Sequence, residues 1–127
     1  MTTENEIGTI VVQEAIHIHR GLGPGLLESV YETVLERRLA KQGLVVQRQV
    51  PVQVRFEEDV FEEGFRADLI VNKKVLLELK SIEAINNVHR KQLLTYLRLT
   101  EIKLGYLLNF GEEVMKNSIT RTINGRL

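Results

Sequence analysis

The chain has 127 residues, of which 43% are hydrophobic, so it is long enough to bury a core and too apolar to be disordered. It contains no cysteine, which excludes disulfides, a thiol nucleophile and a cysteine-ligated metal site. Its 17 Lys and Arg balance its 17 Asp and Glu, whereas nucleic-acid binders usually have a basic excess.

The part of the chain before Gly43 has the periodicity of two helices. Apolar residues recur every three or four positions from Ile7 to Arg20, and the breaker Gly21-Leu22-Gly23-Pro24-Gly25 ends this stretch. A second helix is predicted from about Leu26 to Gln42, because Gly43 is a suitable C-terminal stop.

After Gly43 the apolar period changes to two, which predicts strands. An extended run over 44–56 and a second over 60–71 flank an acidic turn, with Gly64 as a candidate bulge. The connection Asn72-Lys73-Lys74 leads to a strand over 75–81, whose continuous apolar run indicates burial on both faces and a central position.

The remaining elements are a helix over about 87–100, a buried strand over 103–110 and a short strand over 118–123. Together the elements predict a single α/β (α+β) domain over 1–127, with a mixed central sheet flanked by helices. The N-terminus lacks signal-peptide features, and no apolar run reaches the roughly 20 residues of a membrane helix. We therefore expect a cytoplasmic protein.

Charge is distributed unevenly along the chain. Residues 1–85 hold 10 Lys and Arg against 14 Asp and Glu, whereas residues 86–127 hold 7 against 3. A basic C-terminal part would suit a phosphate-facing side beside an acidic metal site. A solvated surface without function is the alternative interpretation.

The segment GFRADLIVNKKVLLELKS carries the candidate chemistry. Side chains alternate along a strand, so Glu78 and Lys80 share one face, and Asp68 lies on the preceding strand. A three-residue connection would set Asp68 opposite Glu78, and a two-residue connection would set it on the wrong face. The sequence leaves both registers open.

In the favourable register, two carboxylates and an ammonium converge. Asp68 and Glu78 are the oxygen ligands that Mg²⁺ or Mn²⁺ prefers, and the backbone carbonyl of Leu79 could add a third oxygen. Lys80 would position the attacking water or stabilise charge that builds on a phosphate. An exposed ion pair without function is the competing interpretation of the same three residues.

Two helical pairs extend the candidate site. Glu28 and Tyr31 lie about one turn apart, so Glu28 could be a further metal ligand and Tyr31 a substrate-binding residue. Gln92 and Tyr96 are four residues apart and could hydrogen-bond to a phosphate or to the site carboxylates. A first-turn acid and ordinary amphipathic helix residues are the alternatives.

These motifs resemble the GxxExxY family of the PD-(D/E)XK nuclease superfamily. The name motif stands at Gly25-Leu26-Leu27-Glu28-Ser29-Val30-Tyr31, and the resemblance covers about residues 6–124. It implies a restriction-endonuclease-like core, with Asp68 and Glu78 as metal ligands, Lys80 as the catalytic lysine and Glu28 completing the acidic cluster. Ala67 replaces the proline of the superfamily's PD element.

The leading hypothesis is a Mg²⁺- or Mn²⁺-dependent nuclease that hydrolyses phosphodiesters of DNA or RNA, with DNA favoured as the partner. One alternative is a catalytically inactive nucleic-acid-binding or regulatory module on the same fold, which the zero net charge would suit. Another is a scaffold whose carboxylates form ordinary ion pairs. A homodimer is compatible with each of these hypotheses.

Overall fold

The computed structural model describes residues 2–127. These residues form one sheet with helices on both faces, which confirms the predicted α+β class; a short 3-10 helix is the one element that periodicity does not predict. The elements in chain order are α1 (Glu4–Leu22), α2 (Glu28–Lys41), β1 (Val46–Phe56), β2 (Asp59–Val71), β3 (Val75–Lys80), α3 (Asn87–Thr100), β4 (Leu104–Asn109), η1 (Met115–Asn117) and β5 (Ile119–Ile123).

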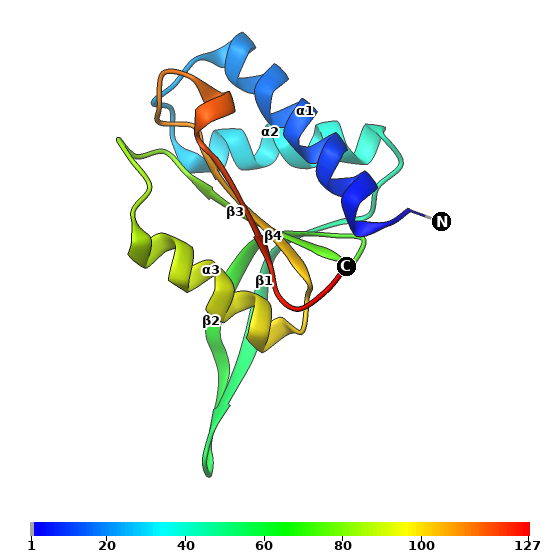
Figure 1. Cartoon of the computed structure of the whole chain (residues 1–127), viewed down its shortest axis with the longest axis vertical. Coiled ribbons are helices and arrows are strands. Elements are labelled where there is room, and N and C mark those ends of the chain that lie inside the picture. The colour runs from blue at the N-terminus through cyan, green and yellow to red at the C-terminus, as the bar shows by residue number, and fades with distance from the viewer. Residues whose placement is uncertain (1) are drawn as a thin grey trace.

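The sheet has the strand order β1-β2-β3-β4-β5, with β3 at its centre as predicted. Strands β1, β2 and β3 are successively antiparallel, β3 and β4 are parallel, and β5 is antiparallel to β4. Parallel neighbours need a crossover connection, and α3 provides it between β3 and β4 (Figure 1). The carboxyl ends of β3 and β4 therefore lie at the same edge of the sheet.

Two hydrophobic cores form on opposite faces of the sheet. Helices α1 and α2 cover one face and α3 covers the other (Figure 1). Leu77 and Leu79 of β3 belong to the α1/α2 core, whereas Leu76 packs with Leu93 and Leu97 of α3. The alternation of β3 thus directs the even-numbered residues Glu78 and Lys80 toward the α3 side.

The N-terminal ends of α1 and α3 are fixed by local capping. Thr3 and Glu6 form a capping box that starts α1, and Asn86 accepts hydrogen bonds from the backbone amides of Val88 and His89 at the start of α3. None of the helices in residues 2–127 has the length and hydropathy needed to cross a membrane.

Strands β1 and β2 continue beyond the sheet as a two-stranded ribbon that projects from the body (Figure 1). Their register shifts between Val52 and Val54, opposite the part of β2 that contains Gly64. A Cβ at Gly64 would collide with the Val54 side chain. The bulge predicted at Gly64 is therefore confirmed, and glycine is there because Val54 occupies the space of a side chain.

Candidate metal and catalytic site

Asp68 and Glu78 meet at the point where β2 and β3 separate. The ladder between these strands ends at Leu69 paired with Leu77, after the three-residue connection 72–74. Continuing this register by one residue places Asp68 opposite Glu78. The favourable of the two registers left open by the sequence is therefore the one that forms.

The two carboxylates replace the ladder hydrogen bonds beyond this point. Glu78 Oε2 accepts a hydrogen bond of 2.8 Å from the backbone amide of Asp68, and Asp68 Oδ2 accepts one of 2.8 Å from the amide of Leu79. Each acid is thus held by the backbone of the other's strand. Glu78 is only 6% exposed, so its orientation is also fixed by packing.

The environment of these acids disfavours their charged forms. Burial raises the pKa of Glu78 to about 8, and the nearby charge of Asp68 contributes to this increase. Burial also raises the pKa of Asp68, against the hydrogen bond from the Leu79 amide. The positive charge of Lys80 opposes these increases and lowers the pKa of both acids.

Lys80 ends β3 at the edge where β4 still supports it. Lys80 pairs with Asn109 of β4, and the Lys80 backbone carbonyl accepts a hydrogen bond of 2.8 Å from the Phe110 amide. The Asn109 side chain is fully buried and bonds to both backbone groups of Ile82. The side chain of the half-buried Lys80 therefore projects from a fixed backbone.

Helix α3 brings Tyr96 near the acids and leaves Gln92 on the surface. Tyr96 is half-buried and stacks on Phe65 of β2, with ring centroids 3.8 Å apart and an interplanar angle of 2°. Burial, followed by the charges of Glu78 and Asp68, raises the pKa of its hydroxyl. The hydroxyl therefore stays protonated at neutral pH and can donate a hydrogen bond. Gln92 is exposed one turn earlier.

Tyr31 does not fit the substrate-binding role expected of it. Its side chain is fully buried and stacks on Phe110, with ring centroids 4.3 Å apart. Its hydroxyl donates to the Gly23 carbonyl at 2.6 Å and accepts from the Leu26 amide at 3.0 Å. A ring inside the core cannot contact nucleic acid, so we assign Tyr31 the role of holding the glycine-rich connection before α2.

Replacing Tyr31 with phenylalanine should lower the free energy of unfolding by about 0.5–1.5 kcal/mol, because it removes the hydrogen bonds of the hydroxyl with the Gly23 carbonyl and the Leu26 amide. Urea denaturation measures this change. Tyr31→Leu should cost more, since it also removes the stacking on Phe110. Unchanged stability of Tyr31→Phe together with weaker substrate binding would restore the substrate-contacting interpretation.

Helix α2 contributes two acids, of which the sequence pattern identified only one. Glu28 is exposed at the first position of α2, and its charge raises the pKa of Asp68. Glu32, one turn later, is 6% exposed, and its charge raises the pKa of both Asp68 and Glu78. The i, i+4 spacing of Glu28 and Glu32 on one helical face was the signal that could have identified it.

Glu32 is held by two consecutive residues of β1 that were also missed. Arg48 Nε donates to Glu32 Oε2 at 2.7 Å, and Gln49 Nε2 donates to Glu32 Oε1 at 2.7 Å. Regular alternation would place Arg48 and Gln49 on opposite faces of the strand. No sequence signal indicates that both reach one carboxylate.

The donor set fits a hard divalent cation, although the side chains are not arranged around one. Among residues 2–127, no three or more His, Asp or Glu side chains are grouped so that they could hold a metal ion. Asp68 and Glu78, however, are two carboxylates whose pKa values are raised mainly by burial and further by neighbouring acids, so a cation would favour their charged forms. Oxygen ligands in this state match the preference of Mg²⁺.

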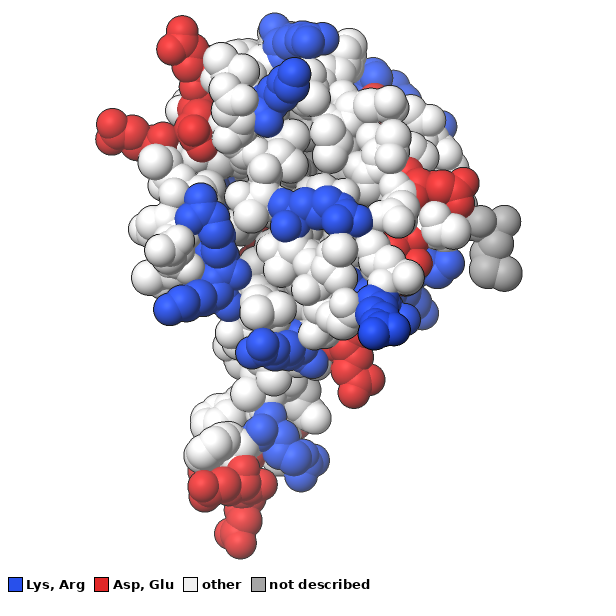
Figure 2. Space-filling model, viewed as in Figure 1, with Lys and Arg blue, Asp and Glu red and all other residues white. Residues whose placement is uncertain are grey.

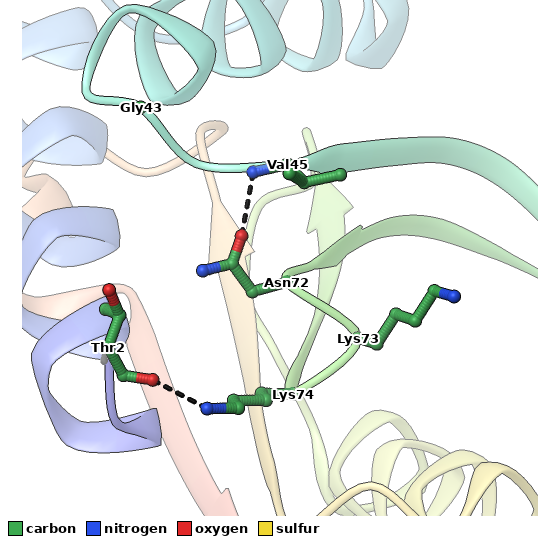
Figure 3. A pocket seen from close by; sticks show the side chains of 6 residues that line it. All are labelled: Thr2, Gly43, Val45, Asn72, Lys73 and Lys74. Carbon is green, nitrogen blue, oxygen red and sulfur yellow. Dashed lines mark hydrogen bonds between the residues drawn. The ribbon is translucent and has the colours of Figure 1, made fainter.

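Two surface hollows differ in their relation to the site. One of about 450 Å³ lies where α2 begins and is lined by residues 25–29 and by Ser81, the residue that follows Lys80 in the chain. The other, of about 410 Å³, is lined by Thr2, Gly43, Val45 and the connection 72–74 (Figure 3). It lies at the opposite end of β3 and no acid lines it, whereas Glu28 lines the first hollow.

The basic C-terminal part of the chain contributes to one face of the molecule. In Figure 2, Lys and Arg side chains are spread over the face that α3 and β5 present in Figure 1, and acids lie at the tip of the ribbon and at the upper left and right margins of the view. Helix α3 also carries Gln92 and Tyr96, so this face adjoins the site.

Comparison with known proteins agrees with this geometry. The profile of the PD-(D/E)XK nuclease superfamily matches residues 5–122, which is nearly the whole chain. No curated protein and no solved structure gives a significant match. The mixed sheet with helices on both faces is consistent with the restriction-endonuclease-like fold of that superfamily.

Proposed function

Since this chain belongs to the PD-(D/E)XK nuclease superfamily, we propose that it is a divalent-metal-dependent nuclease that hydrolyses phosphodiester bonds of nucleic acid. One observation carries this proposal: Asp68 and Glu78 stand opposite each other where β2 and β3 separate, within the influence of the Lys80 charge. DNA is the favoured substrate and Mg²⁺ or Mn²⁺ the cofactor. The motif around Glu28 supports membership of the GxxExxY group.

Asp68 and Glu78 would hold the cation, with the Leu79 carbonyl as a further oxygen. When bound, such an ion polarises the phosphate and lowers the pKa of a coordinated water. Glu28 is exposed on α2, so its side chain is free to reorient and complete the acidic cluster. Glu32 supplies additional negative charge from the same helix, which would favour cation binding.

Lys80 is the residue we assign to the reaction centre. Its ammonium shares a face with Glu78, so it can orient the attacking water and stabilise charge that develops on the phosphate. The protonated hydroxyl of Tyr96 can donate to a phosphate oxygen, and Gln92 extends the same helical face into solvent. The basic face over α3 and β5 would follow the backbone of the nucleic acid.

Incubation of the wild-type protein with single- and double-stranded DNA and RNA, each with Mg²⁺, Mn²⁺ or EDTA, tests the proposal. We expect cleavage that EDTA abolishes and that Asp68→Ala reduces at least about 100-fold. Glu63→Ala is the matched control, because Glu63 lies in the ribbon and pairs with Arg66. No cleavage by the wild type, or equal cleavage by Asp68→Ala, would refute the enzymatic function; binding without turnover would indicate an inactive module.

A further inference from the structure

Gln49 occupies an unusual position beside the candidate metal ligands. Its neighbours in β1 pair with β2 as Arg48 with Leu69 and Val50 with Ala67, so Gln49 stands opposite Asp68. Its φ of 51° lies in the left-handed region, which is unfavourable for residues with a side chain and which glycine adopts readily. Such strain in the middle of a strand requires contacts that compensate for it.

The side chain of Gln49 makes those contacts between two carboxylates. Nε2 donates to Glu32 Oε1 at 2.7 Å and lies 3.4 Å from Asp68 Oδ1. Both partners are acceptors, so only the NH₂ end of the amide can face them. Asp68 Oδ2 already accepts a hydrogen bond from the Leu79 amide, and Gln49 Nε2 is the donor for the other oxygen, Oδ1.

The positive φ explains how neighbouring residues reach the same acid. In a regular strand Arg48 and Gln49 would point to opposite faces, but the turn of the backbone at Gln49 lets both contact Glu32. Arg48 balances the charge of the buried Glu32, and the amide of Gln49 links Glu32 to Asp68 by hydrogen bonds. A neutral amide can join two carboxylates that would repel each other in direct contact.

We propose that Gln49 is a positioning residue: together with Arg48 and Glu32 it fixes the Asp68 carboxylate in the orientation in which it faces Glu78. The amide acts through Asp68 and does not touch the reacting atoms. The consequence for metal binding rests on the function proposed above, because it requires that Asp68 be a ligand. The consequence for the orientation of Asp68 holds without any metal.

Hydrogen exchange of the Leu79 amide tests the positioning role in metal-free protein, because this amide donates to Asp68. In Gln49→Met, which keeps the length of the side chain and loses its donors, we expect this amide to exchange at least about 10-fold faster. The Leu77 amide in the same strand should be unaffected. Gln53→Met is the matched control, since the Gln53 amide faces Glu62 in the ribbon.

Gln49→Gly separates positioning from general stability, because glycine relieves the backbone strain while removing the amide. We expect its melting temperature to equal or exceed that of Gln49→Met, with the same fast exchange at Leu79. Mn²⁺ affinity, measured by calorimetry, should fall about 10-fold or more in both variants. Wild-type exchange at Leu79 in Gln49→Met would overturn the proposal, whether or not Mn²⁺ binds. Absence of Mn²⁺ binding by the wild type would instead refute the metal dependence, and the exchange data would still decide the role of Gln49.

Discussion

Replacing Lys80 with methionine is expected to reduce phosphodiester cleavage at least about 100-fold without weakening Mn²⁺ binding. Methionine retains much of the apolar stem and removes the ammonium. Lys80 is half-buried at the end of β3, where the Phe110 amide fixes its backbone, so the fold should tolerate this change. Removing a positive charge from beside Asp68 and Glu78 cannot disfavour a cation there, and Mn²⁺ should bind as tightly as before or more tightly.

The combination of lost turnover and retained metal binding is what distinguishes a catalytic lysine from a structural one. Single-turnover cleavage and calorimetric titration with Mn²⁺ measure the two quantities on the same preparation. Lys74→Met is the matched control, because Lys74 donates to the Thr2 carbonyl at the other end of β3, away from the acids. Parallel loss of metal affinity and activity in Lys80→Met would show that Lys80 supports the fold of the site and does not act on the substrate.

The architecture of the sheet was largely predictable because its signals are local. The change of apolar period after Gly43, the all-apolar run from Val75 and the helix over 87–100 each correspond to an observed element. The 3-10 helix Met115–Asn117 has too few residues to show a period. The register between β2 and β3 was reduced to two alternatives, and the length of the connection 72–74 decided between them.

The site was less predictable than the fold, because its contacts join residues that are distant in sequence and meet only through tertiary packing. Tyr31 was expected at the substrate because it follows Glu28 by one turn, but that turn directs it into the α1/α2 core. Glu32 lies one turn after Glu28 on the same helical face, and this spacing was available in the sequence, but its contacts with Arg48 and Gln49 depend on the packing of α2 against β1. Gln49 could not be identified at all, since its positive φ breaks the alternation from which its direction would be inferred.

Replacing Glu78 with glutamine is expected to stabilise the metal-free protein at pH 8 and to flatten the dependence of its stability on pH. Glutamine keeps the shape and can still accept the Asp68 amide with its oxygen. The wild-type carboxyl has a pKa of about 8 when folded, and a usual value near 4.5 when unfolded. Between these values the folded chain holds one proton more than the unfolded chain, so the free energy of unfolding should fall by up to about 1.4 kcal/mol per pH unit as pH rises.

Urea denaturation in EDTA from pH 5 to 8 measures this slope. Glu63→Gln is the control: Arg66 lowers the pKa of the exposed Glu63, so this substitution should leave the slope unchanged.

The same linkage predicts the effect of a cation. A divalent ion favours the ionised carboxylates, so Mn²⁺ should stabilise the wild type more at pH 8 than at pH 6 and should release protons on binding at pH 7. Calorimetry in buffers of different ionisation enthalpy counts those protons. If the free energy of unfolding depends on pH equally in the wild type and in Glu78→Gln, Glu78 is already ionised without a metal. Burial would then not keep its carboxyl protonated in the metal-free protein.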